Sequence, residues 1–298
     1  MTKEPDFPTK TKTIIPPSKI KPAVPASLQK AKPLPKLSPK KKFKVETYDV
    51  ENQGERIIVY ADSGIGKTTL ISLLGDVVFI DLYGGSDKIK HPVTGEPLTY
   101  IPGVETFQDV RDVLQSPEVF KDYGTVCIDT VTRLEQIAEP WIFANILASK
   151  NRRVKHLKEY GWNEGYYHLY NTMRLILQDC ENLIHQGKNI VLSAQSSPIK
   201  VANAGGEDFL KDAPRLYDGK PSNVAQFVEW ADHVFKIGYI DLAVEEKKAK
   251  GSTTRGIYTD GEVYFTAKSR TISSEYPVIS FENPQDDSIW KFLFKDKS

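Results

Sequence analysis

Short apolar runs alternate with amphipathic stretches over much of the chain, and this alternation sets the expected fold. The runs predicted to be buried strands are 56–60, 77–81, 99–101, 125–129 and 189–194. Helices are predicted at 67–74, 106–115, 133–149 and about 165–186, with Thr106 as the N-cap of the second. Continuous apolar strands separated by helices are typical of a parallel sheet that helices cover on both faces.

The pattern changes after Ala231. Strand-rich segments cover residues 233–242, 256–267 and 278–281, and a charged tip at 245–255 separates the first two. This arrangement predicts an antiparallel hairpin that extends the same sheet. The expected fold is therefore α/β, with a mostly parallel sheet, flanking helices and a C-terminal antiparallel extension.

The first 44 residues show no helix or strand periodicity and differ in composition. They contain 12 lysines, two acidic residues and 9 of the 19 prolines, a net charge of +10. Since the whole chain has a formal net charge of +1, the remainder carries −9. We expect a disordered basic arm over residues 1–44 and one domain over 45–298. Attraction to nucleic acid, attraction to an acidic partner and simple solubilisation are all open as roles for the arm.

The sharpest motif follows the first apolar run and reads Ala-Asp-Ser-Gly-Ile-Gly-Lys-Thr-Thr over residues 61–69. It matches the phosphate-binding loop GxxxxGKS/T, with alanine in place of the first glycine. Backbone N–H groups of such a loop hold phosphate oxygens, and the dipole of the following helix adds positive potential. The residues expected to bind the nucleotide are Asp62, Ser63, Gly64, Ile65, Gly66, Lys67, Thr68 and Thr69.

Two residues of this loop have expected chemical tasks. Lys67 is expected to reach the β- and γ-phosphates, and the Thr68 hydroxyl is expected to ligate Mg²⁺. Ala61 is compatible with the motif if its φ is negative, because its Cβ then meets no steric conflict. The sequence therefore predicts a site for a nucleoside triphosphate and Mg²⁺, with ATP as the expected nucleotide and GTP as the open alternative.

Two later strands end in polar residues. The run 125–129 ends at Asp129, which is expected to hold Mg²⁺, as a strand-end aspartate does in phosphate-loop enzymes; capping of the next helix is the alternative. The run 189–194 leads to Gln195. Because side chains at the carboxyl ends of parallel strands converge on the ligand crevice, Gln195 is expected to sense the γ-phosphate or the attacking water. A glutamine that satisfies backbone groups of a loop is the competing interpretation.

These motifs together resemble the RecA-like P-loop ATPase core. More narrowly, the chain resembles the phage-type nucleotide-binding ATPases related to the Sak family of single-strand annealing recombinases. The resemblance covers about residues 50–282 and rests on the phosphate loop, on the strands before Asp129 and Gln195, and on three further segments. These are Phe-Ile-Asp-Leu-Tyr-Gly-Gly-Ser-Asp at 79–87, Tyr-Gly-Trp-Asn-Glu-Gly-Tyr at 160–166 and Ala-Lys-Ser-Arg-Thr at 267–271.

The resemblance implies an ATPase that forms a homo-oligomer and acts on single-stranded DNA, with a single-strand-binding or replication protein as a further partner. It also implies that Lys268 and Arg270 are catalytic fingers, since RecA-like filaments use basic residues there to reach the γ-phosphate of a neighbouring subunit. Two solvated basic residues at a strand end are the alternative.

One position departs from the RecA-like pattern. Tyr83 stands where such enzymes commonly have a glutamate that positions the attacking water. A phenol, with an ordinary pKa near 10, is not a base at neutral pH. Either hydrolysis is slow, or another carboxylate serves, the candidates being Asp81, Asp87 and Glu105.

Basic residues interleaved with aromatic ones follow the third predicted helix. In single-strand binding, cations follow phosphates and aromatic rings stack on bases, at roughly 1–3 kcal/mol per base. The expected DNA-binding residues are Arg152, Arg153, Lys155 and Trp162 and, in a second loop over 196–222, Lys200. A solvated helix end whose aromatics cover the core is the alternative for the first group. The second loop is too long for a simple connector.

Other classes of protein are less compatible with the chain. No apolar stretch approaches the roughly 18 residues that span a membrane, and the lysines and prolines of the arm do not form a secretory signal. Cys127 and Cys180 are too few for a disulfide scaffold, which favours a reducing cytoplasm, that of a host cell if the chain is phage-encoded.

The expected function is that of an ATPase in DNA recombination, annealing or repair. The rival is a nucleotide-dependent binding switch with little or no hydrolysis that serves a replication or packaging partner. A small-molecule kinase is disfavoured because no arginine-rich lid is present. DNA-stimulated hydrolysis separates the first interpretation from the second.

Overall fold

The computed structural model describes residues 44, 45, 47, 52–203, 205–240, 242–245, 248–251 and 254–294. The arm expected over 1–44 lies outside these residues except for its last one, so it stays a prediction. Tyr48–Ser298 forms one unit of the chain, and the elements below belong to it.

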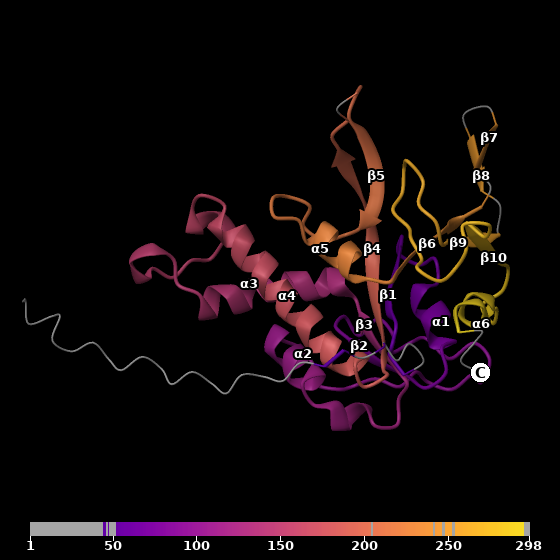
Figure 1. Cartoon of the computed structure of the whole chain (residues 1–298), viewed down its shortest axis with the longest axis horizontal. Coiled ribbons are helices and arrows are strands. Elements are labelled where there is room, and N and C mark those ends of the chain that lie inside the picture. The colour runs from indigo at the N-terminus through magenta and orange to yellow at the C-terminus, as the bar shows by residue number, and fades with distance from the viewer. Residues whose placement is uncertain are drawn as a thin grey trace, which may run out of the picture. The chain divides into compact units, whose positions relative to one another are not determined.

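A mixed sheet of eight strands runs through this unit (Figure 1). Five parallel strands stand in the order β2-β3-β4-β1-β6, and β9 and β10 continue the sheet antiparallel beyond β6. The strands of this sheet are β1 (Arg56–Ala61), β2 (Val77–Asp81), β3 (Thr125–Asp129), β4 (Asn189–Val201), β5 (Phe209–Pro214), β6 (His233–Tyr239), β9 (Arg255–Tyr258) and β10 (Val278–Phe281). The predicted fold class is confirmed.

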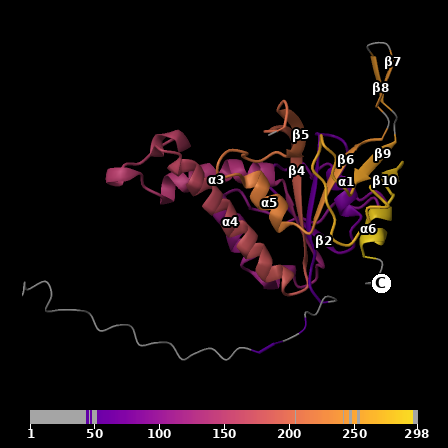
Figure 2. The ribbon, with the colours of Figure 1, turned by 45° about the horizontal axis from the view of Figure 1, so that its top comes forward.

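Helices cover both faces of the sheet (Figures 1 and 2). One face packs against α2, α3, α4 and α5 and the other against α1 and α6, so two apolar cores lie on the two sides of the strands. The helices are α1 (Lys67–Ser72), α2 (Phe107–Leu114), α3 (Val131–Asn145), α4 (Glu164–Ile184), α5 (Asn223–Trp230) and α6 (Ser288–Leu293), with 3-10 turns at Pro117–Phe120, Ser149–Asn151 and Leu157–Tyr160.

Two helices begin at a threonine whose side chain caps the first turn. Thr106 caps α2 as predicted, because its hydroxyl accepts the N–H of Asp109 while the Asp109 carboxylate accepts the N–H of Thr106. Helix α3 begins two residues earlier than predicted, since Thr130 caps it through the N–H of Arg133. Its end at residue 145 rather than 149 has no such local signal.

The strand predicted at 99–101 is wrong. Only Tyr100 pairs there, in a single parallel bridge with Phe79. The N–H of Phe79 donates to the carbonyl of Thr99, and the N–H of Ile101 donates to the carbonyl of Phe79. Pro102 follows at once and has no N–H, so the ladder cannot continue in that direction.

The loop predicted over 196–222 is also wrong in its first half. β4 does not stop at residue 194 but continues to Val201, and β5 returns antiparallel to it from Phe209 to Pro214. This β4–β5 ribbon, residues 196–214, projects beyond the edge of the sheet (Figure 1). The chain then leads through Tyr217 to α5, a helix that the sequence pattern did not predict.

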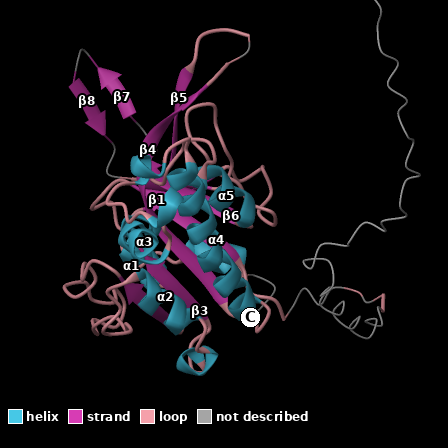
Figure 3. Ribbon diagram, turned by 90° about the vertical axis from the view of Figure 1, so that its left-hand side faces the viewer, coloured by secondary structure: helices cyan, strands magenta, loops and turns pink. Residues whose placement is uncertain are grey.

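The C-terminal extension is shorter in the sheet than expected. β6 and β9 pair antiparallel, but β6 ends at Tyr239 and β9 at Tyr258, whereas the predictions reached residues 242 and 267. Between them, β7 (Leu242–Glu245) and β8 (Lys248–Gly251) pair antiparallel in a separate two-stranded hairpin, of which β8 lies in the charged tip (Figure 3).

Candidate nucleotide site

The loop between β1 and α1 owes its shape to two glycines. Gly64 has a φ of 81° and Gly66 a φ of 107°, a region that residues with side chains rarely adopt. Within the described part of the chain, the N–H groups of Ser63, Gly64 and Gly66 make no hydrogen bond. Free donors in a tight turn form a cradle for anions. Ala61 is buried at the end of β1 and is not among the residues of positive φ, so its side chain causes no conflict.

Lys67 begins α1 and turns its amino group back toward the loop. Its Nζ donates to the carbonyl oxygen of Ala61 at 3.0 Å and of Asp62 at 2.9 Å, and to Oε1 of Gln195 at 3.3 Å. The residue is 7 % exposed, and burial lowers its pKa against the opposing charge of Asp129. All three acceptors are neutral oxygens. The cation can therefore exchange them for phosphate oxygens, with which it forms stronger charge-assisted bonds.

Thr68 and Asp129 meet beside this lysine. The Thr68 hydroxyl donates to Oδ2 of Asp129 at 2.7 Å. Burial raises the pKa of Asp129, and the bond from Thr68 lowers it in part. A hydroxyl and a carboxylate at this spacing are hard oxygen donors, which fits Mg²⁺, an ion that takes few protein ligands and keeps several waters. A bound Mg²⁺ would neutralise charge on the phosphate oxygens.

Gln195 stands between the phosphate loop and Asp129 because β4 lies between β1 and β3. Ala61 pairs with Gln195 across β1 and β4, and Asp129 pairs with Ser193 across β3 and β4. The N–H of Gln195 donates to the hydroxyl of Thr132 at 3.1 Å, which fixes the backbone at this point. The sheet therefore brings together Lys67, Thr68, Asp129 and Gln195, as the sequence predicted.

A cleft of about 310 Å³ opens over these residues. Besides the loop, its lining includes Asp81, Tyr83 and Ile89 from the end of β2 and the segment after it. Asp87 and Glu105, two of the alternative carboxylates, are exposed and are not part of the lining. Of the described residues, Asp81 and Asp129 are thus the carboxylates that face the cleft.

Asp81 holds the turn after β2 and is not a free base. Its Oδ1 accepts the N–H groups of Tyr83 at 3.0 Å and Gly84 at 2.9 Å, and its Oδ2 accepts the N–H and the hydroxyl of Ser86. Burial acts to raise its pKa, but these hydrogen bonds outweigh burial, and the pKa lies below its ordinary value. A carboxylate stabilised in this way accepts a proton poorly.

Tyr83 occupies the position of the missing glutamate. Its side chain is 55 % exposed and lines the cleft. The guanidinium of Arg133 lies 5.4 Å from the ring centroid, and the Tyr83 hydroxyl donates to Oε1 of Gln136 at 3.5 Å. Both contacts tie the ring to α3. A phenol bound to α3 therefore stands at the position where the resemblance led us to expect a glutamate.

Arg255 is a site residue that the sequence analysis missed. From β9, its Nη1 donates to the carbonyl oxygen of Ile65 in the phosphate loop at 2.9 Å, and its guanidinium lies 4.4 Å from the ring centroid of Phe281. A Cβ added to Gly66 would lie 2.8 Å from Nη1. Arg255 thus braces the loop against the C-terminal extension. Its place in a charged tip carried no signal for this contact.

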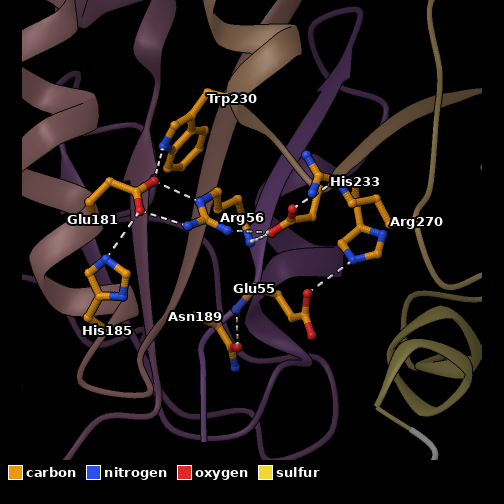
Figure 4. A network of polar contacts seen from close by, with 9 residues as sticks. Glu55, Arg56, Glu181, His185, Asn189, Trp230, His233 and Arg270 are labelled. Atoms are coloured by element: carbon orange, nitrogen blue, oxygen red, sulfur yellow. Dashed lines mark hydrogen bonds and ion pairs between the residues drawn. The ribbon is translucent and has the colours of Figure 1, made fainter. Parts of the chain in front are cut away.

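The expected fingers lie at the opposite end of the sheet. Lys268 pairs through its backbone with Val234 near the start of β6, and Nε of Arg270 lies 3.1 Å from Oδ1 of Asp232 (Figure 4). Asp232 also pairs with Arg56, the first residue of β1, whereas the phosphate loop follows its last. At about 3.3 Å per residue, β1 separates the two ends by about 16 Å. Lys268 and Arg270 therefore do not reach the phosphate loop of their own chain.

The expected DNA-binding residues are all exposed, in two separate places. Arg152, Arg153, Lys155 and Trp162 lie in the connection between α3 and α4, where Trp162 is 101 % exposed and Arg152 pairs with Glu159 at 3.3 Å. Lys200 lies on the β4–β5 ribbon and pairs with Asp208 at 2.8 Å. Among the described residues, neither of these two ion pairs joins one place to the other. Nucleic acid would have to displace both of these exposed ion pairs, which are weak at best.

The order of the parallel strands, the loop after β1 and the polar ends of β3 and β4 together define a P-loop NTPase. The model of a protein family described as an AAA domain matches residues 53–271. Since this match covers well over half of the chain, the protein belongs to that family of AAA domains, P-loop domains of the ATPase type that bind nucleotide. No curated protein matches the chain.

Two further observations concern membrane-spanning helices and the cysteines. Among the described residues, no helix is both long enough and apolar enough to cross a membrane. Both cysteines, Cys127 and Cys180, are buried and free.

Proposed function

We propose that this protein is a RecA-like ATPase, related to the Sak family of phage recombinases, that binds ATP·Mg²⁺ and acts on single-stranded DNA in recombination, annealing or repair. The observation that carries the proposal is the continuity of β4. This strand passes from Gln195, beside the phosphate loop, directly into the ribbon that bears Lys200. A change at the γ-phosphate therefore has a short mechanical route to a basic, exposed element.

Different residues of the cleft bind different parts of ATP·Mg²⁺. The N–H groups of the loop and the amino group of Lys67 bind the phosphates, while Thr68 and Asp129 hold Mg²⁺. Gln195 turns its amide from Lys67 to the γ-phosphate or to the attacking water. When the γ-phosphate leaves, the 3.3 Å contact between Lys67 and Gln195 can form again. This exchange makes Gln195 a switch at the base of the ribbon.

Two exposed groups support single-stranded DNA as the substrate. The α3–α4 connection offers cations together with Trp162, and the ribbon offers Lys200. Cations contact phosphates in any sequence, and an exposed indole stacks on an unpaired base. Because the chain outside the basic arm has a net charge of −9, binding should be confined to these elements and the arm.

Action of Lys268 and Arg270 on ATP requires a second copy of the chain. Since both residues lie at the amino ends of the parallel strands and the phosphate loop lies at the carboxyl ends, the subunits would have to stack head to tail. Such a heterologous contact closes into a ring or continues as a filament. Arg270 is the better placed of the two, because its side chain is 62 % exposed.

The experiment that tests the proposal is ATP hydrolysis by the full chain, with and without single-stranded DNA. We expect stimulation by DNA that disappears in Lys67→Ala and survives in Lys121→Ala, an exposed lysine remote from the cleft. Trp162→Ala should weaken the stimulation but leave the basal rate unchanged. Hydrolysis that DNA does not alter would refute the assignment of the substrate.

A second function is favoured by one observation. Of the described carboxylates that line the cleft, Asp81 is already bonded to the backbone and Asp129 is assigned to Mg²⁺, while a phenol stands at Tyr83, so none of these groups is free to activate the attacking water. A nucleotide switch that binds ATP tightly and barely hydrolyses it fits this chemistry. Tight binding of ATP without turnover, in the presence and absence of DNA, would establish the nucleotide switch and refute the proposed ATPase.

A further inference from the structure

The base of the β4–β5 ribbon brings a second residue opposite Gln195. The ladder pairs Ser196 with Pro214, and one step further the N–H of Arg215 donates to the carbonyl of Gln195 at 2.7 Å. Arg215 is thus the residue directly across the ribbon from the candidate γ-phosphate sensor. It belongs to the same chain as the phosphate loop.

The backbone of Arg215 is held on both sides. Before it, β5 is paired with β4; after it, the N–H of Tyr217 donates to both carboxylate oxygens of Glu135 at 2.9 and 3.0 Å. The ring of Tyr217 also stacks on Tyr166, with centroids 4.5 Å apart and an interplanar angle of 11°. The position of this backbone is therefore set by α3, by α4 and by the ribbon.

The side chain of Arg215 is in contrast uncommitted. It is exposed, and its guanidinium makes no hydrogen bond or ion pair with any residue that the structure describes. Residues that stand directly opposite each other in an antiparallel pair have their side chains on the same face, and the Gln195 side chain on that face accepts a hydrogen bond from Nζ of Lys67 at 3.3 Å.

We propose that Arg215 is a catalytic residue that acts in cis, binding the γ-phosphate of the ATP held by its own phosphate loop. The inference rests on the proposed function in that it takes ATP as the ligand of the cleft. It goes beyond that function by assigning the cation at the γ-phosphate to the ribbon of the same subunit. Lys268 and Arg270 would then act in trans on a site that already holds one arginine.

The chemical role of Arg215 is to stabilise charge. In hydrolysis, the water oxygen bonds to the γ-phosphorus and the bond to the β–γ bridging oxygen breaks. ADP leaves with that electron pair, one water proton stays on the released phosphate and the other goes to solvent. Charge on the equatorial oxygens is stabilised by a guanidinium, which can donate two parallel hydrogen bonds.

This placement also makes the ribbon a coupling device. Gln195 and Arg215 flank the base of its two arms, and in this proposal both contact the γ-phosphate. Nucleic acid bound along the ribbon would order the arms and so set both residues. Binding of DNA and capture of the triphosphate should therefore strengthen each other by the same factor.

The first test measures binding rather than turnover. Full-length protein is titrated with fluorescent ATPγS and fluorescent ADP in the presence of Mg²⁺. Arg215→Ala should lose about 10- to 100-fold in affinity for the triphosphate and keep its affinity for the diphosphate. The triphosphate affinity of Arg215→Lys should lie between those of the wild type and Arg215→Ala, since lysine keeps the charge but cannot donate two parallel hydrogen bonds. Arg174→Ala, which removes an exposed arginine from α4, is the matched control and should change neither affinity.

The second test separates action in cis from action in trans by mixing subunits. Arg215→Ala should lower kcat by about 10³-fold, as the removal of an arginine finger does. Mixed with Lys67→Ala, it should regain no activity, because no subunit then has both residues. A mixture of Arg270→Ala with Lys67→Ala should regain activity if Arg270 acts in trans.

Several outcomes would overturn the inference. These are equal losses for triphosphate and diphosphate, no loss in Arg215→Ala, or recovery of activity when Arg215→Ala is mixed with Lys67→Ala. Failure of the proposed function is a different result. If the wild type binds ATPγS but shows no turnover, the ATPase assignment fails while the comparison of triphosphate with diphosphate still decides the role of Arg215.

Discussion

Arg56 offers the strongest test of how the sheet is fastened to its helices. Its Nε and Nη2 each donate to a Glu181 oxygen at 2.7 Å, and its Nη1 lies 3.1 Å from Oδ2 of Asp232 (Figure 4). The Glu181 carboxylate also accepts Nε1–H of Trp230 at 2.6 Å. One side chain at the start of β1 thus joins α4 to the junction of α5 and β6. The substitution Arg56→Met removes the guanidinium but keeps much of the apolar stem.

The magnitude follows from the exposure of the partners. The Arg56, Glu181 and Asp232 side chains are 21, 29 and 10 % exposed. Removing one partner of a fully buried pair costs about 3–5 kcal/mol, and an exposed pair is worth about 0–1 kcal/mol. Water reaches Glu181, and Asp232 keeps its contact with Arg270. The loss of stability should therefore lie at the lower end of the range for a fully buried pair. We expect Arg56→Met to lower the free energy of unfolding by about 3 kcal/mol at pH 7.

The loss should depend on pH in a direction set by Glu181. The hydrogen bond from Arg56 lowers the pKa of Glu181 below its ordinary value of 4.5. The stabilisation is therefore complete above pH 4.5 and is lost as pH falls through the lower pKa of the folded state. The difference between the wild type and Arg56→Met should shrink in that range.

Urea unfolding between pH 7 and pH 3.5 measures this difference. A double-mutant cycle with Glu181→Gln should give a coupling energy of about 1.5–2 kcal/mol at pH 7. Arg174→Met, on the exposed face of α4, is the control and should stay within about 0.5 kcal/mol of the wild type. A loss below about 1 kcal/mol at pH 7 would refute the reasoning, as would one of the same size at all pH values.

The remaining predictions concern the loop and the cleft. Arg255→Ala should weaken ATP binding about tenfold or more in a fluorescence titration, because it removes a charge-assisted bond to the loop; unchanged affinity would show that the brace is not needed. Gly66→Ala should weaken ATP binding about tenfold in the same assay, since a φ of 107° is strained for any residue with a Cβ and Arg255 would have to move away from the loop. Ala61→Gly, which restores the usual glycine, should bind ATP no better and lose about 1 kcal/mol of unfolding free energy, because Ala61 is a buried strand residue. Glu135→Ala leaves the N–H of Tyr217 and the amide of Asn223 without an acceptor and should cost about 2–4 kcal/mol on urea unfolding; a smaller loss would mean that water replaces the carboxylate.

Some parts of this molecule follow from local sequence alone. The phosphate loop is a backbone structure of nine consecutive residues, so two glycines, a lysine and a threonine at fixed spacing predict it. The placement of Asp129 and Gln195 was predicted by a rule nearly as local, that polar residues at the ends of buried parallel strands meet at one edge. The capping box at Thr106 depends only on residues three apart.

Other parts were decided by contacts between distant segments. The extension of β4 beyond Ala194 depends on a partner strand that begins at Phe209, whereas Pro198 within residues 196–201 argues locally against a strand. Asp81 was considered as a base, yet the turn that it faces donates backbone hydrogens to it. Whether a carboxylate is free or occupied depends on backbone geometry that residue types do not specify.

The difference between the features that local sequence predicts and those that it does not has a physical reason. The sequence by itself determined the phosphate loop, because a loop of this kind requires a short segment of set composition. Only the tertiary structure decided that Arg255, 190 residues from Ile65, braces the loop, that Arg215 stands across from Gln195, and that Arg270 lies at the far end of the sheet. The local sequence around an exposed arginine is the same whether its side chain contacts water, a carbonyl or a phosphate. Which of these the arginine can reach depends on where the strand order of the sheet places it.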